Sequence, residues 1–136
     1  MNAQGFPLLV ARLLMALMFL SGGYEKLAHL EGTLGYMASA GVPAIAPLAL
    51  AAGALELGGG LLLIVGWQAR WAALALAGFT VVASVIFHNF WAMPAAQQMT
   101  QQLMFMKNIG VVGGLLLVFA VGAGSLSLDA RRNVNA

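Results

Sequence analysis

Four long apolar stretches divide the chain, and shorter runs with polar residues or proline separate them. The stretches cover roughly residues 7–27, 47–67, 70–91 and 103–122. Each is about 20 residues long, which as an α-helix crosses a hydrocarbon layer of about 30 Å. None shows the alternation of a membrane β-strand. The pattern therefore predicts an all-α fold: an integral membrane four-helix bundle with antiparallel helices.

The connecting runs differ in character. Residues 28–46 are amphipathic and end in glycine and proline, which predicts a short interfacial helix after the first span. Only Gln68 and Ala69 separate the second and third stretches, so these two must form an antiparallel hairpin. Residues 92–102 are polar and rich in glutamine, and they are expected to connect the last two spans. Residues 125–136 are expected to form a polar, frayed cytoplasmic tail.

Composition supports the membrane assignment and removes several classes of function. Hydrophobic residues make up 62% of the chain and charged residues 7%, whereas a soluble domain carries about 25% charged residues. The lipid bilayer is therefore the expected surrounding. A net charge of +2 without a lysine and arginine cluster argues against nucleic acid. The absence of cysteine excludes disulfides, iron–sulfur clusters and thiolate metal sites, so a redox role needs a bound organic cofactor or substrate.

The basic residues predict the orientation. Four spans place both termini and the hairpin on one side, which also holds most of the cations: Arg12, Arg70, Arg131 and Arg132. The other side holds Lys26 and Lys107. The positive-inside rule then places both termini on the cytoplasmic side of the membrane. The first stretch lacks the basic start and nearby cleavage site of a secretory signal, so it is interpreted as a retained span.

A few polar groups interrupt the spans, and each needs a partner or a use, since a charge there costs at least about 2.5 kcal/mol. Glu56 lies about nine residues into the second stretch, near mid-depth. Lys26 ends the first stretch and His88 lies near the end of the third. Lys107 and Asn108 are expected to open the fourth helix. The helix dipole opposes a lysine at that position, so Lys107 is expected to have a compensating anion.

The depths of these groups predict a polar pocket in the outer half of the bundle. The first and third helices end on the outer side, and the second and fourth begin there. The expected lining adds one tyrosine, two methionines and a phenylalanine: Tyr24, Met37, Phe87 and Met106. Such a pocket suits a small planar ligand, with lysine or histidine donating to a carbonyl oxygen and Glu56 taking a proton. Arg12, about 21 Å below Lys26 along an ideal helix, is expected to meet head groups or a helix end.

Neither a metal nor a haem site is expected. His29, His88 and Glu31 have no metal-ligand spacing, and no haem motif surrounds either histidine. The glycine clusters at 58–60 and 110–114 are interpreted as helix-packing positions.

Six motifs occur in order along nearly the whole chain: Ser21-Gly22 with Lys26, Tyr36-Met37 with Gly41-Val42-Pro43, Glu56 with Gly59-Gly60, Gly66 with Arg70, Phe87-His88 with Phe90-Trp91, and Met106-Lys107-Asn108 with Gly113-Gly114. In these motifs the chain resembles the DoxX family of small bacterial membrane proteins. The resemblance implies a four-helix inner-membrane protein. Some relatives are linked to a thiosulfate:quinone oxidoreductase and others to membrane complexes for oxidative-stress defence, while many have no established activity.

Three hypotheses follow for the function. The first is a quinone-linked or redox-associated subunit, for which a redox partner protein supplies the electron donor; no catalytic residue is identified. The second is a structural or assembly protein whose buried ion pairs fix helix packing. The third is a small-solute or proton carrier, which would need a homo-oligomer to widen its path.

Overall fold

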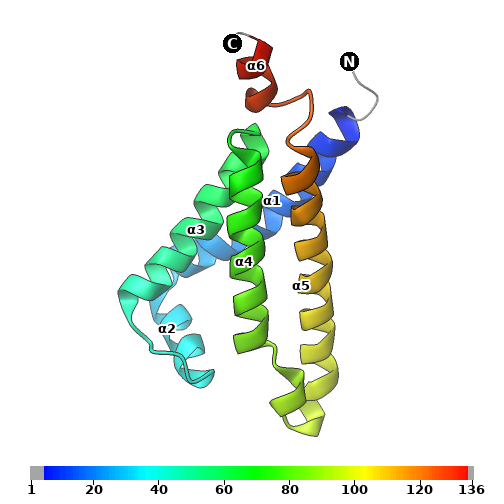
Figure 1. Ribbon diagram of the computed structural model, residues 1–136. Helices are drawn as coiled ribbons and strands as arrows, with labels where there is room; N and C mark the ends of the chain where they lie inside the picture. The colour runs from blue at the N-terminus through cyan, green and yellow to red at the C-terminus, as the bar shows by residue number, and fades with distance from the viewer. Residues whose placement is uncertain (1–4, 135–136) are drawn as a thin grey trace.

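The computed structural model describes residues 5–134, and all of its regular elements are helical (Figure 1). In chain order they are α1 (Gly5–Ala28), α2 (Leu30–Ser39), α3 (Ala46–Val65), α4 (Ala69–Phe87), the 3-10 turn η1 (Phe90–Ala92), α5 (Ala95–Val121) and α6 (Leu128–Val134). Four of the helices, α1, α3, α4 (extended through η1) and α5, are long and apolar enough to cross a membrane. The predicted all-α, four-span, antiparallel fold with a short helix after the first span is confirmed.

Two connections differ from their sequence-based prediction. α5 begins at Ala95 rather than near 103, and so takes in most of the glutamine-rich run. Alanine, glutamine and methionine all favour helix, and polarity does not end a helix outside the hydrocarbon layer. The C-terminal segment forms α6 instead of a frayed tail. Ser127 caps α6, because its Oγ accepts the backbone N–H of Ala130 at 3.2 Å.

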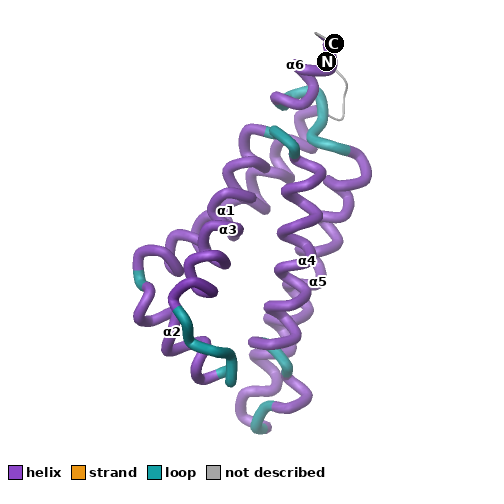
Figure 2. Tube along the Cα trace, turned by 60° about the vertical axis from the view of Figure 1, so that its left-hand side comes forward, coloured by secondary structure: helices purple, strands orange, loops and turns teal. Residues whose placement is uncertain are grey.

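The four long helices form two closely packed pairs, α1 with α3 and α4 with α5. The pairs meet where α3 turns into α4, here named the α6 end, and diverge toward the opposite α2 end (Figure 2). Both described termini lie at the α6 end (Figure 1). The buried core also lies where the pairs meet, and its large fully buried apolar members are Phe19, Leu63, Leu76, Leu115 and Val118.

Glycines allow the close packing of α1 on α3. A Cβ at Gly23 would lie 2.6 Å from the Leu57 nitrogen and 2.8 Å from the Gly53 oxygen, so the two backbones touch at this point. A Cβ at Gly59 would lie 2.8 Å from the Leu76 side chain, so this glycine lets α3 approach α4. The predicted packing role is confirmed for Gly59 and for Gly114, whose Cβ would lie 2.9 Å from the Met15 sulfur, whereas Gly113 has no such neighbour within 4 Å.

Arg12 fastens α1 to the last part of the chain. Its guanidinium is fully buried and donates to the carbonyl oxygens of Leu63 at 2.6 Å, Ile64 at 3.3 Å and Leu126 at 2.6 Å. The first two carbonyls belong to the last turn of α3, where a cation is favoured by the helix dipole. The prediction that Arg12 meets a helix end is confirmed.

Asp129 of α6 caps the start of α4. Its two carboxylate oxygens accept the backbone N–H groups of Gln68 at 2.8 Å and Ala69 at 3.0 Å. The Asp129 N–H in turn donates to the Gly66 oxygen at 2.9 Å. Residues from both ends of the described chain thus hold the α3–α4 turn.

Substituting Gly66 should weaken this end of the bundle. Gly66 ends α3 with φ of 65°, and a Cβ there would contact the Arg12 guanidinium and lie 2.5 Å from the Ser127 Cβ. We expect Gly66→Ala to lower the free energy of unfolding by about 1–3 kcal/mol, measured by thermal unfolding in detergent. Gly58→Ala is the matched control, because a Cβ at Gly58 has no such neighbour within 4 Å. Equal melting temperatures for the two variants would contradict this.

Candidate functional site

The site is centred on an ion pair between α1 and α3. The Lys26 Nζ lies 2.7 Å from the Glu56 Oε2, and the two side chains are 30% and 10% exposed. Nζ also lies 3.4 Å from the Gly22 carbonyl oxygen, one helical turn earlier on α1. The predicted proximity of Lys26 and Glu56 is therefore present. A lysine at the end of a span would otherwise extend to the interface, and here it turns inward to the acid.

Gly22 gives the Glu56 carboxylate its space. A Cβ on Gly22 would lie 3.1 Å from Glu56 Oε1 and 3.5 Å from Oε2. Gly22 and Lys26 are four residues apart, so they share one face of α1. That face supplies the cation and also the gap into which the acid fits. This explains why the Ser21-Gly22 motif lies four residues before Lys26: both Gly22 and Lys26 must face Glu56.

A second set of polar groups lies within the α4–α5 pair. The Asn108 side-chain amide donates to the Ser84 Oγ at 2.9 Å, and the Ser84 hydroxyl donates to the Thr80 oxygen at 2.6 Å. The His88 Nδ1 lies 2.7 Å from the Gln101 Oε1. Thr80 and Ser84 of α4 and His88, which directly follows α4, lie at intervals of four residues. This spacing was the sequence signal for Thr80 and Ser84, which the sequence analysis did not single out.

The predicted cluster is thus divided between the two helix pairs. Lys26 and Glu56 belong to α1 and α3, and His88 and Asn108 belong to α4 and α5. Within residues 5–134 no hydrogen bond or ion pair joins the two sets. The helix pairs diverge toward this end of the bundle (Figure 2).

Lys107 does not occupy the position that the sequence suggested. Because α5 begins at Ala95, Lys107 lies well inside the helix and the expected conflict with the N-terminal dipole does not arise. Its side chain is exposed, and its Nζ lies 3.8 Å from the Met104 sulfur. In the described part of the chain no carboxylate forms an ion pair with it. The compensating anion is therefore not found there.

The expected lining of the pocket is only partly buried. Tyr24 is 60% exposed and Met106 is exposed as well, whereas Met37 is buried. Phe87 stacks on Tyr36 of α2 with ring centroids 4.9 Å apart, so α2 contacts the end of α4. Partial burial raises the pKa of the Tyr36 hydroxyl above its ordinary value.

Comparison with known proteins decides the family. The DoxX family model matches residues 7–89, which is more than half of the chain. The chain belongs to the DoxX family. Inner membrane protein YqjF of Escherichia coli K12 is 40% identical over 126 residues, covering 92% of this chain and 91% of YqjF. Inner membrane protein YphA of the same organism is 33% identical over 129 residues, covering 95% and 92%. The chain is accordingly a multi-pass inner-membrane protein.

More distant similarity reaches eukaryotic proteins. The ER-derived vesicles protein ERV29 of Saccharomyces cerevisiae is 23% identical over 133 residues, which cover 98% of this chain and 36% of ERV29. No solved structure matches the chain.

The DoxX match covers one of the two polar sets completely and the other only in part. It includes Lys26, Glu56 and His88, and it ends before α5 with Lys107 and Asn108. The Lys26–Glu56 pair is therefore the part of the site that lies wholly within the DoxX match.

Proposed function

We propose that this DoxX-family protein is a quinone-linked membrane subunit in which the Lys26–Glu56 pair binds the carbonyl edge of a small planar compound. The observation that supports the proposal is an acid–base pair between two helices of a membrane bundle, in which Glu56 is buried and Lys26 is partly buried. Apolar residues of similar volume often stabilise a protein as well as a buried ion pair does. An ionisable pair retained inside a span therefore favours a functional use.

The two side chains have the chemistry that a quinone carbonyl needs. The Lys26 ammonium has three N–H donors. One faces Glu56, and a second faces the Gly22 oxygen, which lies at the long distance of 3.4 Å from Nζ. A donor thus remains for a carbonyl oxygen. Glu56 can accept or release a proton at Oε2. A bound quinone would supply two-electron, two-proton chemistry, with electrons from a redox partner protein.

Binding of short-chain quinones tests the proposal. Purified protein in nanodiscs is titrated with short-chain ubiquinone and menaquinone analogues, and the affinity is measured by calorimetry. We expect saturable binding that Glu56→Gln and Lys26→Met each weaken about tenfold or more, because each removes a charge-assisted hydrogen bond. Lys107→Gln is the control, since it removes an exposed lysine that has no carboxylate partner among the described residues.

An absence of saturable binding, or one affinity shared by the wild type, Glu56→Gln, Lys26→Met and His88→Ala, would overturn the proposal. A loss confined to His88→Ala would instead move the site to the α4–α5 pair.

The closed geometry of the pair favours a second candidate function. At 2.7 Å, Lys26 and Glu56 neutralise each other and fasten α1 to α3. A structural or assembly role then predicts that Lys26→Met with Glu56→Leu leaves the fold and any membrane complex intact. Co-purification of the complex with the double variant would measure this.

A further inference from the structure

Among the described residues, the α6 end of the bundle carries four arginines and a single carboxylate, that of Asp129. Arg12 is buried on three carbonyl oxygens, and both oxygens of Asp129 accept backbone N–H groups of α4. Arg70, Arg131 and Arg132 are exposed. Among residues 5–134 no ion pair involves these three arginines. Their guanidinium groups are therefore available to an external anion.

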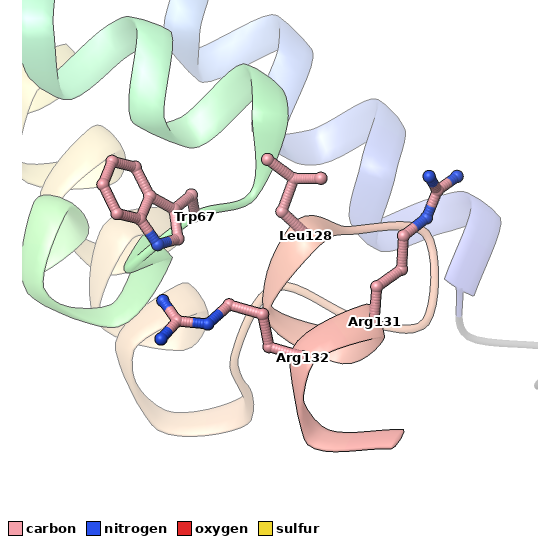
Figure 3. A pocket seen from close by; sticks show the side chains of 4 residues that line it. All are labelled: Trp67, Leu128, Arg131 and Arg132. Carbon is pink, nitrogen blue, oxygen red and sulfur yellow. The ribbon is translucent and has the colours of Figure 1, made fainter. Parts of the chain in front are cut away.

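Two of these arginines line an open pocket that is partly apolar. The pocket has a volume of about 360 Å³ and is lined by Trp67, Leu128, Arg131 and Arg132. Arg132 extends toward Trp67 on one side of Leu128, and Arg131 extends on the other side (Figure 3). Trp67 is 44% exposed. The lining thus combines two cations with an aromatic and an aliphatic side chain.

The walls of the pocket are held in place by the surrounding contacts. Trp67 belongs to the α3–α4 turn, to which Asp129 ties α6 through three hydrogen bonds. Ser127 caps α6, and Arg12 holds the Leu126 carbonyl just before it. The arginines therefore project from a fixed helix. Binding of a ligand therefore costs less conformational entropy than it would for arginines in a disordered tail.

We propose that this pocket binds the phosphate head group of an anionic phospholipid. Guanidinium groups recognise phosphate oxygens through paired, charge-assisted hydrogen bonds. The pocket lies where the α3 and α4 spans end, which is the depth of the head groups. Tryptophan is typical of that depth, and Trp67 and Leu128 offer apolar surface to the glycerol and the upper acyl chain. That surface favours a lipid over free phosphate.

Fluorescence quenching by brominated lipid tests the proposal. Trp71→Phe with Trp91→Phe leaves Trp67 as the single tryptophan. The variant is reconstituted in phosphatidylcholine vesicles that contain the same fraction of brominated phosphatidylglycerol or brominated phosphatidylcholine. We expect the anionic lipid to quench Trp67 at a several-fold lower fraction than the zwitterionic lipid. Equal quenching by the two lipids overturns the proposal.

Two charge-matched variants separate a site from general surface attraction. Arg132→Gln removes a pocket cation, and Arg70→Gln removes an exposed cation of the same end that does not line the pocket. We expect Arg132→Gln to remove most of this several-fold anionic preference and Arg70→Gln to leave it nearly unchanged. Arg132→Lys should keep part of the preference, which guards against misfolding of Arg132→Gln. Equal losses in Arg132→Gln and Arg70→Gln overturn the proposal.

Soluble anions distinguish the lipid from its head group alone. Millimolar inorganic phosphate or glycerol phosphate is added to the vesicles at constant ionic strength. Persistence of the anionic preference supports a lipid site. Loss of the preference identifies an anion site that does not need the acyl chains, and it overturns the assignment to a phospholipid.

Discussion

Replacing Arg12 by methionine will lower the free energy of unfolding by about 3–5 kcal/mol, because hydrogen bonds to a charged group contribute about 1.5–3 kcal/mol each. The fully buried guanidinium makes two hydrogen bonds of 2.6 Å, to Leu63 and Leu126. Methionine fills part of the volume and leaves both carbonyl oxygens without their donor. Thermal or denaturant-induced unfolding in detergent measures the loss.

The loss should be localised as well as large. Without Arg12 the segment around Leu126 loses its link to α1, so hydrogen exchange should rise in α6 before it rises in α3. Arg70→Met is the control, since Arg70 lies at the same end and is exposed. The interpretation fails if Arg12→Met and Arg70→Met melt at the same temperature with equal exchange in α6.

Removing only one partner of the Lys26–Glu56 pair should lower the free energy of unfolding by a similar amount. Lys26→Met leaves the 10%-exposed Glu56 side chain without its cation, and removal of one partner of a buried pair costs about 3–5 kcal/mol. Replacing both residues, as in Lys26→Met with Glu56→Leu, should restore most of this stability, because no charge is then left unpaired. A double-mutant cycle of unfolding free energies measures the coupling.

The same double variant separates the two proposed roles. If the pair is a quinone site, the variant is stable and its affinity for quinones is lost. If the pair only fastens α1 to α3, the variant is stable and its affinity for quinones equals that of the wild type. A double variant that is no more stable than Lys26→Met would contradict the expected coupling.

The spans could be predicted from the sequence because their length and apolar content are set by the membrane itself. The first turns of α5 could not be predicted in this way, because a membrane requires apolar residues only within its hydrocarbon layer. The run after Pro94 consists of good helix formers that extend beyond that layer. Helix α6 was missed for another reason. It is short, and it depends on tertiary partners such as the α3–α4 turn that Asp129 caps.

The sequence predicts how deep each polar residue of the site lies in the membrane, but not which neighbouring helix it faces. Counting residues along a span gives the height of Glu56 and Lys26, and these two do form a pair. It does not give the helix with which each span packs. That choice depends on close contacts such as Gly23 against Gly53, which bring α1 to α3 and leave His88 with α5. Lys107 was misplaced because its predicted role depended on where α5 begins.

The link between Arg12 and Leu126 sets an order for assembly in the membrane. Synthesis from the N-terminus delivers Arg12 114 residues ahead of Leu126 and 51 residues ahead of Leu63. The first span therefore enters the bilayer with an uncompensated cation, which acquires acceptors only after α3 has followed. The arginine-rich end closes only when the residues after α5 leave the ribosome. A chain that ends before Leu126 would contain the sequence of all four spans but would lack the carbonyl oxygen that ties Arg12 to the residues after α5.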